Sequence, residues 1–554
     1  MKLTPLGKVF LVLVVLGTLG FIGYRQYGPQ IKTWAGAGQP GTKTGGEVTK
    51  DDFAQATGKD DVSKKDFAGN YPDAPNKGEI AVSAKNAAVA DQKLTRPLVV
   101  GINTWAGHAP GIVANGGMDP GGAASLYKKK YGLDVKFVLL EDPTAKLNAF
   151  LKGEIDIMWD TVDSYAREAS VLAEKGFSAK SIIQEDWSRG GDGIVSLKSI
   201  KSVEDLKGKK IASTQYTPSH WLLLFLLSQS GLSPQDRAAI EKNIVWTNEA
   251  PQAAAAFKAK QVDAAVTWEP DLSAAVTARG DEAHILVSTT AATNVIADTL
   301  VARQDLVDKA PATVRDFVAG WFDAISVMKE DPEGSNAIVG KALKLANDDV
   351  SGMLSGLKLT GFGDNAQFYG LSGSHSYFES LFNGAFIIWR KKGVVTKSVD
   401  AKDWHDDRFV AAVADQFKSQ KVEESFAFKS KPTVKDRAIV NKSLSIHFTT
   451  GSDEIMPGSY FTLDSLGDTM LAFGNTYLKV EGNTDSRGAA GANKTLSQKR
   501  ADSVRAYLVK NFSIPQERFI TEGKGAENPV AGNDTEDGRA LNRRTDIKVV
   551  LNVQ

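Results

Sequence analysis

The chain of 554 residues contains no cysteine, so disulfides, thiolate metal sites, a cysteine nucleophile and a lipidated N-terminal cysteine are excluded. Its six histidines are scattered without the spacing of metal ligands, and we therefore expect no metal site and no cofactor. Paired carboxylates at catalytic spacing and a nucleophile elbow are also missing from the sequence. The sequence thus argues against an enzyme.

A surplus of charge is absent as well, because 66 basic residues balance 66 acidic ones. Proteins that bind nucleic acid need basic residues in excess to neutralise phosphate, so nucleic acid is not an expected partner. With 42% hydrophobic and 24% charged residues, the composition is that of a globular protein. The chain is too long for one core, and roughly two to four domains are expected.

Residues 1–34 are expected to target or anchor the chain. Lys2 and Lys8 precede an apolar run from Val9 to Tyr24, which suits a short membrane-spanning helix and a signal-peptide core equally well. The nearest small-x-small cleavage motif, at residues 35–37, lies well beyond this run. We predict an uncleaved helix that anchors the chain in the inner membrane, with the rest exported to the periplasm. A cleaved signal peptide is the alternative.

Residues 35–97 are rich in Gly, Lys, Asp, Ala and Pro and contain few large apolar side chains. A segment of this composition cannot bury enough surface to fold alone, so we predict a flexible, disordered linker. A second, short linker is expected at residues 427–439, between folded regions at 98–426 and 440–554.

Residues 98–426 alternate short β-rich runs with helical patterns. Strands are predicted at 98–102, 134–140 and 155–158, and helices at 145–152 and 219–231. Such alternation indicates an α/β fold with largely parallel sheets. Ligands of these sheets bind beyond the carboxyl ends of the strands, so the residues at those ends are candidate ligand contacts.

Tryptophan recurs beside polar residues at four predicted strand ends, at Trp105, Trp159, Trp187 and Trp268. Aromatic rings next to a few hydrogen-bonding groups suggest a stacking pocket for a small molecule. The accompanying polar candidates are His108, Asp160, Asp186, Ser188, Ser219 and Glu269. Ser219 also opens a helix whose N–H groups could bind a ligand oxygen. In the alternative interpretation the rings fill the core and Ser219 only caps its helix.

Three segments, Val100–Gly107, Lys152–Ile157 and Gln261–Pro270, resemble periplasmic solute-binding proteins of the nitrate, sulfonate and taurine type. The resemblance implies two α/β lobes around a ligand cleft, joined by crossing strands, that deliver a solute to an ABC transporter.

The candidate pocket of this chain is acidic, because it contains Asp160, Asp186, Asp192 and Glu269. Such a charge disfavours a simple inorganic anion. Acidic groups beside tryptophan would suit an amine or a heteroaromatic ligand.

A second motif lies near the C-terminus, where a turn carrying Thr484 and Asp485 opens a helix with Asn493, Ser497 and Arg500. Offsets of four and seven residues place the last three on one helix face. Asp485 can accept hydrogen bonds from an ammonium, and the Arg500 guanidinium can grip a carboxylate with two parallel donors. The pair therefore matches the head group of a free amino acid. Alternatively, Asp485 is a turn acid and Arg500 a surface cation.

With the segment Gly538–Arg544, residues 440–554 resemble the OmpA-like peptidoglycan-binding domain, a small α+β fold. In that family the matching Asp and Arg hold the two ends of the diaminopimelate side chain of the wall peptide. The resemblance implies a peptidoglycan site at Asp485 and Arg500, supported by Thr484, Asn493 and Ser497. Where many members have His, this chain has Asn483, which keeps a hydrogen-bonding side chain.

Together these features predict an envelope-anchored receptor that closes on a small solute and is tethered to peptidoglycan. Because the chain has no ATPase motif and at most one membrane helix, it would serve an ABC permease or a signalling partner. The alternative is a wall-tethering scaffold whose receptor-like region binds no ligand.

Overall fold

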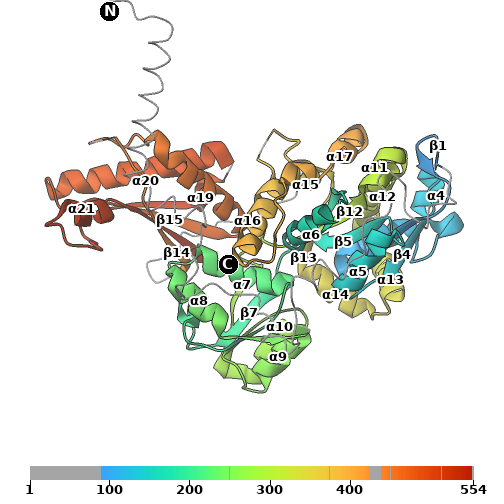
Figure 1. The fold of residues 1–554 in the computed structure, drawn as a ribbon, viewed down its shortest axis with the longest axis horizontal. Helices are drawn as coiled ribbons and strands as arrows, with labels where there is room; N and C mark the ends of the chain where they lie inside the picture. The colour runs from blue at the N-terminus through green and yellow to red at the C-terminus, as the bar shows by residue number, and fades with distance from the viewer. Residues whose placement is uncertain are drawn as a thin grey trace, which may run out of the picture. The chain divides into compact units, whose positions relative to one another are not determined.

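The computed structural model describes residues 89–422 and 438–551, apart from Glu249, Ser374, Thr450 and Ser513. The expected N-terminal anchor and the greater part of both expected linkers lie outside these residues. Within the described ranges, no helix combines the length and hydropathy that a membrane span requires. Three sheets of four or more strands organise this part of the chain (Figure 1).

The first lobe is built on a six-stranded sheet with the strand order β13-β6-β12-β5-β3-β4. Its strands are β3 (Leu98–Ile102), β4 (Val135–Leu139), β5 (Ile157–Thr161), β6 (Ala179–Ser188), β12 (Ala297–Arg303) and β13 (Leu357–Leu359). Its helices are α3 (Ala109–Asn115), α4 (Leu126–Tyr131), α5 (Pro143–Lys152), α6 (Val162–Glu174), α11 (Gln304–Lys309), α12 (Pro311–Glu330), α13 (Pro332–Leu343), α14 (Asn347–Ser355), α15 (Phe362–Phe368), α16 (Tyr377–Lys391), α17 (Arg408–Ala412) and α18 (Ala414–Phe417). The predicted strands and the predicted helix at 145–152 are all present, and Gly153 in the left-handed conformation ends α5.

The first lobe also includes residues expected in the linker at 35–97. Short strands β1 (Val89–Ala90) and β2 (Lys93–Leu94) pair with each other, and the Leu94 N–H donates to the Thr313 hydroxyl at 2.8 Å. The Arg96 guanidinium binds Asp156 with two hydrogen bonds of 2.5 and 2.6 Å. These contacts could not be predicted from the composition of the segment, because they depend on single residues and not on apolar runs.

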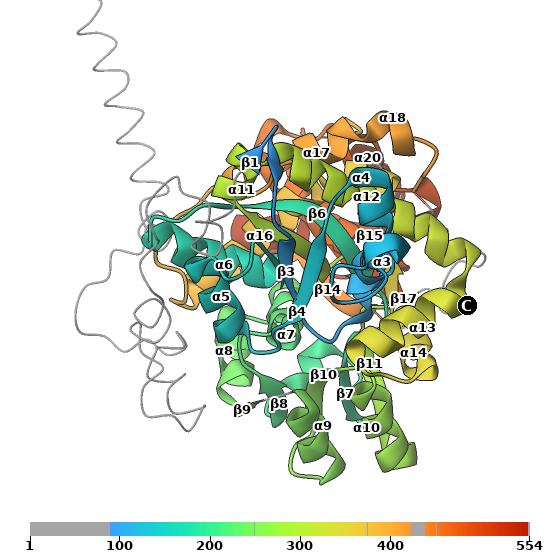
Figure 2. The same ribbon diagram turned by 90° about the vertical axis from the view of Figure 1, so that its right-hand side faces the viewer.

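The second lobe carries a five-stranded sheet with the order β11-β7-β10-β8-β9. Its elements are β7 (Asp192–Leu197), β8 (Ile211–Thr214), α7 (Pro218–Gln229), α8 (Pro234–Lys242), β9 (Ile244–Thr247), α9 (Ala250–Lys258), β10 (Ala264–Trp268), α10 (Asp271–Arg279) and β11 (Ala283–Ser288). Helices α9 and α10 lie next to each other against this sheet (Figure 2), and their apolar side chains form a separate cluster with Val195, Ala212 and Ala265. Helix α7 is apolar on nearly every side and is buried accordingly.

The two sheets are mixed, which corrects the expectation of largely parallel sheets. Strand β3 is parallel to β4 and β5, and β8 is parallel to β9 and β10. Strand β12, however, is antiparallel to β5 and β6, and β7 is antiparallel to β10 and β11. Strands β7 and β12 each follow a connection between the lobes, and the short strand β13 is also antiparallel to β6. The apolar pattern of a buried strand does not reveal the direction in which it runs.

Two connections cross between the lobes, from β6 to β7 and from β11 to β12. The Thr289 hydroxyl accepts hydrogen bonds from the backbone N–H groups of Gly190 (2.8 Å) and Asp192 (3.2 Å), and it lies 3.0 Å from the Ser188 hydroxyl. The Thr289 N–H in turn donates to the Asp192 carbonyl at 2.9 Å. The two crossings are therefore fastened to each other.

The C-terminal region is a small α+β unit with the sheet order β14-β17-β15-β16. Its elements are β14 (Ala438–Leu444), α19 (Tyr460–Ala472), β15 (Thr476–Asn483), α20 (Ala490–Phe512), β16 (Phe519–Gly525), α21 (Glu536–Asn542) and β17 (Thr545–Leu551). Helices α19 and α20 lie on the same side of this sheet (Figure 1). Buried Ala501, Val504 and Leu508 form the apolar stripe of α20.

Candidate functional site

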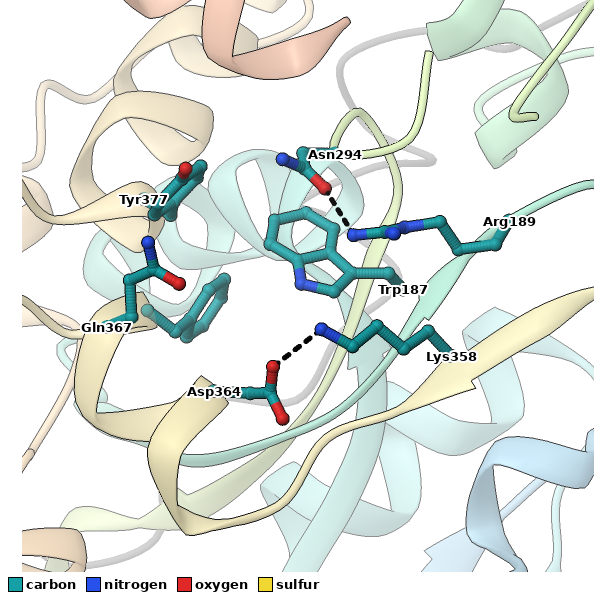
Figure 3. A pocket seen from close by; sticks show the side chains of 8 residues that line it. Trp187, Arg189, Asn294, Lys358, Asp364, Gln367 and Tyr377 are labelled. Carbon is teal, nitrogen blue, oxygen red and sulfur yellow. Dashed lines mark hydrogen bonds and ion pairs between the residues drawn. The ribbon is translucent and has the colours of Figure 1, made fainter. Parts of the chain in front are cut away.

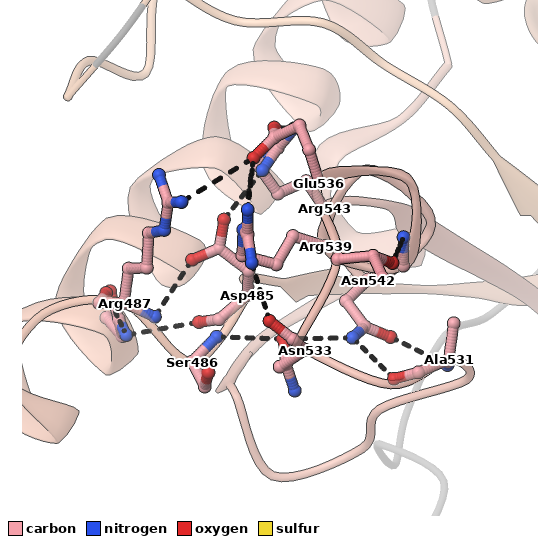
Figure 4. Close-up of polar contacts among 12 residues, drawn as sticks. Asp485, Ser486, Arg487, Ala531, Asn533, Glu536, Arg539, Asn542 and Arg543 are labelled. Atoms are coloured by element: carbon pink, nitrogen blue, oxygen red, sulfur yellow. Dashed lines mark hydrogen bonds and ion pairs between the residues drawn. The ribbon is translucent and has the colours of Figure 1, made fainter.

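The loop between β15 and α20 presents Asp485, the predicted ammonium ligand. One carboxylate oxygen accepts a hydrogen bond from the backbone N–H of Arg487 at 3.0 Å, and the other accepts from Arg543 at 2.7 Å (Figure 4). The same guanidinium donates to Glu536 at 2.7 Å. Asp485 is thus held in place by a charged neighbour that the sequence analysis did not assign to the site.

Arg500, the predicted carboxylate ligand, lies on α20 and is half-buried. Its Nε donates to the Ser452 carbonyl at 3.1 Å, and its guanidinium lies 4.9 Å from the centre of the Phe448 ring. Burial lowers the pKa of Arg500, the neighbouring Arg543 lowers it further, and Asp485 opposes both effects. Asp485 and Arg543, which are in contact with each other, therefore both influence the charge of Arg500.

The other predicted contacts of this motif serve its own backbone. The Asn493 side chain donates to the carbonyls of Asp485 (3.3 Å) and Arg487 (2.9 Å). The Ser497 hydroxyl donates to the Lys494 carbonyl and accepts from the Gly525 N–H at 2.9 Å. The Asn493 and Ser497 side chains thus position the Asp485 loop, and their expected role as ligand contacts stays a prediction.

Thr484 is buried beside Asp485, and its N–H donates to the Gly525 carbonyl at 2.8 Å. Its hydroxyl makes no hydrogen bond within the described residues. Arg543 and Glu536 were missed, although the segment Gly538–Arg544 had been singled out. The motif showed that these residues belong to the domain, but their spacing in the sequence did not predict that they lie near Asp485.

In the first lobe, Trp105 follows β3 at the carboxyl end of the sheet, as predicted. Its indole N–H donates to the Asp186 carboxylate at 3.0 Å. A β-carbon at Gly107 would lie 1.8 Å from that carboxylate and 2.7 Å from the indole nitrogen. Only glycine allows the backbone to approach this pair so closely.

Asp186 belongs to a group of buried carboxyls at the crossings. Asp298 of β12 lies opposite Asp186 of β6 in register, and Thr161 of β5 lies opposite Asp298 on its other side. Burial raises the pKa of Asp186 and of Asp298 well above the usual range, and the carboxyls around them raise it further. The group also includes Asp192, at the start of β7, and Asp163, which opens α6.

Burial also raises the pKa of Asp163 to about 7 and that of Asp192 to about 6. Asp186 and Asp192 were expected here from the sequence. Asp163 and Asp298 were not, because they lie within a helix and a strand pattern without a distinguishing neighbour.

His108 and Asp160 are each engaged in internal contacts. His108 lies 2.6 Å from Glu185 through Nδ1 and 2.7 Å from Asn103 through Nε2, with no exposed surface. Asp160 forms an ion pair of 3.2 Å with Lys146, which pairs equally with Glu168 and lies 4.6 Å from the Trp159 ring. These two side chains thus support the first lobe, and their expected role as ligand contacts stays a prediction.

Trp159 and Trp187 do not follow strands but lie within them, in β5 and β6, because both strands are longer than predicted. Trp187 is 5% exposed and packs edge-on against Phe368 and Tyr377. Figure 3 shows it between two polar pairs, Arg189–Asn294 and Lys358–Asp364, around a hollow of only about 10 Å³. A space of this size holds about one water molecule, so Trp187 packs against its neighbours here, and its contact with a ligand stays a prediction.

The candidates near the second lobe differ in their environment. Trp268 ends β10, lies opposite Asp192 in register and is partly exposed. The Glu269 carboxylate accepts from the N–H (3.0 Å) and hydroxyl (2.6 Å) of Ser273, so it serves the first turn of α10. The Ser188 hydroxyl donates to Asp192 at 2.8 Å. The buried Ser219 hydroxyl makes no hydrogen bond within the described residues.

Two mixed α/β lobes joined by paired crossings, followed by a small α+β domain, define a periplasmic-binding-protein fold with an appended module. Residues 125–335 match the family described as NMT1/THI5 like, and residues 447–543 match the OmpA family. The chain therefore joins an NMT1/THI5-like region to a C-terminal OmpA-family region, which confirms the fusion expected from the two sequence resemblances.

Curated relatives match the C-terminal region. Outer membrane porin F of Pseudomonas fluorescens is 39% identical over 116 residues, which cover 21% of this chain and 35% of that protein. Outer membrane protein A of Bordetella avium is 41% identical over 103 residues, covering 19% and 53%. The peptidoglycan-binding protein ArfA of Mycobacterium tuberculosis is 36% identical over 104 residues, covering 19% and 32%. The chain thus spans about a third to a half of these relatives.

Solved structures similar to the receptor-like region include the periplasmic aliphatic sulphonate binding protein SsuA of Escherichia coli. It has 21% identity and a TM-score of 0.43, and the match covers 55% of this chain and 96% of that one. The periplasmic nitrate-binding protein NrtA of Synechocystis has 16% identity and a TM-score of 0.43, with 58% and 88% covered.

Proposed function

We propose that this protein is a cell-envelope receptor that binds a small solute between its two lobes and holds peptidoglycan through its C-terminal domain. The observation that carries the wall-binding half is the arrangement of Asp485 with Arg500 and Arg543. An acid and a guanidinium on one surface suit an amino-acid head group, which carries an ammonium and a carboxylate. The similarity to a relative named as a peptidoglycan-binding protein supports the same ligand.

Diaminopimelate and lysine differ at the group that Arg500 would bind, because the lysine side chain lacks the terminal carboxylate. The full chain should therefore sediment with purified peptidoglycan of the diaminopimelate type and much less with peptidoglycan of the lysine type. Added diaminopimelate should release it, whereas added lysine should release it less. Equal sedimentation with both wall types would contradict the proposed recognition.

For the solute-binding half, support comes from the fold and from the polar groups at the crossings of the two lobes. The measurement is the melting temperature of the full chain across a panel of small solutes, since a ligand at about 100 times its dissociation constant adds about 2.7 kcal/mol of stability. At least one solute should raise the melting temperature and change the tryptophan fluorescence. A complete lack of response would favour the alternative, a wall-tethering scaffold.

The location and partners remain part of this proposal. Residues 1–34 would hold the chain at the inner membrane, residues 35–88 would connect it to the lobes, and an ABC permease or a signalling partner would receive the closed form. If the anchor is retained, N-terminal sequencing of the mature protein begins at Met1 or Lys2. A start near residue 38 would instead show a cleaved signal peptide.

A further inference from the structure

Four carboxyl groups lie together where the chain crosses between the lobes: Asp163, Asp186, Asp192 and Asp298. We call them the crossing carboxyl cluster. Their residues are between 0% and 7% exposed, and they come from four different elements, α6, β6, β7 and β12. Asp163, Asp186 and Asp192 each act on Asp298 as a like charge. The cluster is therefore one electrostatic unit.

The charge of this cluster is poorly balanced. For Asp186, Asp192 and Asp298 the leading influences are burial, other carboxyls and single hydrogen bonds. Arg167 acts on Asp163 as a cation. The nearby acid Glu185 faces His108, while Lys146 pairs with Asp160 and Glu168. Buried carboxylates without a matching cation are costly, so a proton or a bound cation must neutralise them.

Several polar atoms of this cluster are also unsatisfied within the described residues. Asp186 Oδ1 and Asp163 Oδ1 are buried and make no hydrogen bond, and neither does the Thr161 hydroxyl, in a residue that is 4% exposed. Thr161 lies opposite Asp298 in register and beside Asp163, so its hydroxyl belongs to the same surface. Buried oxygen atoms of this kind are acceptors that await a donor.

Asp186 and Asp298 lie opposite each other on the neighbouring strands β6 and β12. Burial and the nearby carboxyls, Asp186 among them, raise the pKa of Asp298, so this group holds a proton more tightly than a carboxyl in water does. A ligand with N–H donors and a positive charge could take the place of such a proton. An oxyanion would instead bring a further acidic group to a surface that already has four.

We propose that the solute of the two-lobed region is a small organic cation with several N–H donors, an amine or a guanidine, bound by the crossing carboxyl cluster. This inference rests on the proposed function, since it names the chemical class of that receptor's ligand. The ammonium or guanidinium donates to Asp186, Asp298 and Asp163, whose oxygen atoms accept. Trp105, tied to Asp186 by its indole N–H, places an aromatic ring next to the cation.

The test compares four probes on the full chain by melting temperature and titration calorimetry. The cations 1,4-diaminobutane and agmatine should raise the melting temperature with increasing concentration. Tetramethylammonium, which has the charge but no N–H donor, should have at least tenfold weaker affinity. Methanesulfonate, which has the opposite charge, should have no effect.

The matched variants are Asp298→Asn and Asp348→Asn. The first removes a carboxylate of the cluster with little change of shape, and it should weaken binding of the best cation at least tenfold. Asp348 is an exposed residue of α14, and its substitution should leave binding unchanged. If Asp298→Asn does not fold, the comparison of the four probes on the natural chain still shows whether the ligand is a cation with N–H donors.

Stabilisation by methanesulfonate and not by the amines would overturn this inference while leaving the receptor function intact. A protein stabilised by acid but by none of the cations would show that protons alone neutralise the cluster, which also overturns it. If a broad solute panel fails as well, the receptor function fails together with the inference. Equal binding by Asp298→Asn would place the cation elsewhere.

Discussion

The Asp485 carboxylate accepts a hydrogen bond of 2.7 Å from the Arg543 guanidinium, which is itself about one-third exposed. The acid that would receive the ammonium of a wall peptide is therefore already paired with a cation of the same domain. A ligand ammonium must join this pair or displace Arg543 from it. Because the pair is partly exposed to water, its own contribution to stability is small.

The first prediction concerns Asp485 and Arg500, the two proposed ligand contacts of the wall-binding domain. Asp485→Ala and Arg500→Ala should each weaken binding of the full chain to diaminopimelate-type peptidoglycan by about 10- to 100-fold. A hydrogen bond to a charged group typically contributes about 1.5–3 kcal/mol. Sedimentation with purified peptidoglycan at increasing protein concentration measures the change.

Lys499→Ala and Asp537→Ala are the controls for these variants. Both residues are exposed, and they lie next to the site on α20 and α21. Each substitution removes the same charge as its test variant, so a non-specific charge effect would appear in both. Retained binding by Asp485→Ala and Arg500→Ala would remove the basis for the proposed site.

The second prediction separates two tryptophans that the sequence treated alike. Trp187→Ala should destabilise the empty lobes by about 3–5 kcal/mol, because it removes a buried ring that packs on Phe368 and Tyr377. Trp268→Ala should affect the empty protein much less, since this ring is partly exposed at the end of β10. The melting temperature of each variant without ligand shows which of the two rings contributes to the stability of the empty protein. A larger loss for Trp268→Ala would reverse the assignment.

The third prediction concerns the buried cation Lys146, which is 1% exposed and balances both Asp160 and Glu168. Lys146→Met keeps the length of the side chain but leaves two buried carboxylates without this partner. Breaking a buried ion pair from one side typically costs about 3–5 kcal/mol. Lys152→Met, on the exposed face of the same helix, should change the melting temperature little.

Adding Asp160→Asn and Glu168→Gln to Lys146→Met should restore part of the lost stability, because the uncompensated charges are then removed together. No recovery in this triple variant would mean that Lys146 acts through packing and not through its charge.

The fourth prediction is a pH dependence of the empty lobes. Burial raises the pKa of Asp163 to about 7 and that of Asp192 to about 6, whereas an unfolded aspartate titrates near pH 3.9. Between these values the folded state binds more protons than the unfolded state, so stability falls as the pH rises from about 4 to about 7. Melting temperatures should therefore decrease from pH 5 to pH 8.

Asp163→Asn should flatten this decrease, since the substituted side chain does not titrate. Asp348→Asn, which changes an exposed carboxyl, should leave the slope as it is. A slope unaffected by Asp163→Asn would assign the pH dependence to other groups.

The fold could be predicted from the sequence to the extent that apolar periodicity reports it. Leu98–Ile102 and the helix that ends at Gly153 were placed correctly, because a buried run and a left-handed glycine are local signals. The antiparallel placement of β7 and β12 was not predictable, because direction within a sheet depends on where the chain crosses between lobes. Residues 89–96 were missed for a related reason, since single contacts such as Arg96 with Asp156 leave no periodic trace.

Sequence reasoning could pair Asp485 with Arg500 because one motif holds both residues. In the structure burial lowers the pKa of Arg500 and Asp485 opposes this effect, and the roles of both as ligand contacts stay predictions. Arg543 is far from Asp485 in the sequence. The two residues meet because Asp485 follows β15, Arg543 precedes β17, and these strands are neighbours in the sheet. In the lobes, strand ends were predicted too early, so Trp187 was expected in a pocket although β6 carries it into the core.

The bonds around Thr289 bear on how the two lobes can move. One hydroxyl group joins the β11–β12 connection to Ser188, Gly190 and Asp192 of the β6–β7 connection, so the two connections are held together at this point. We expect this link to restrain the two connections from moving independently when the lobes change their angle. Thr289→Val would remove these hydrogen bonds while keeping a side chain of similar size. The angle between the lobes should then vary over a wider range, even in the absence of any solute.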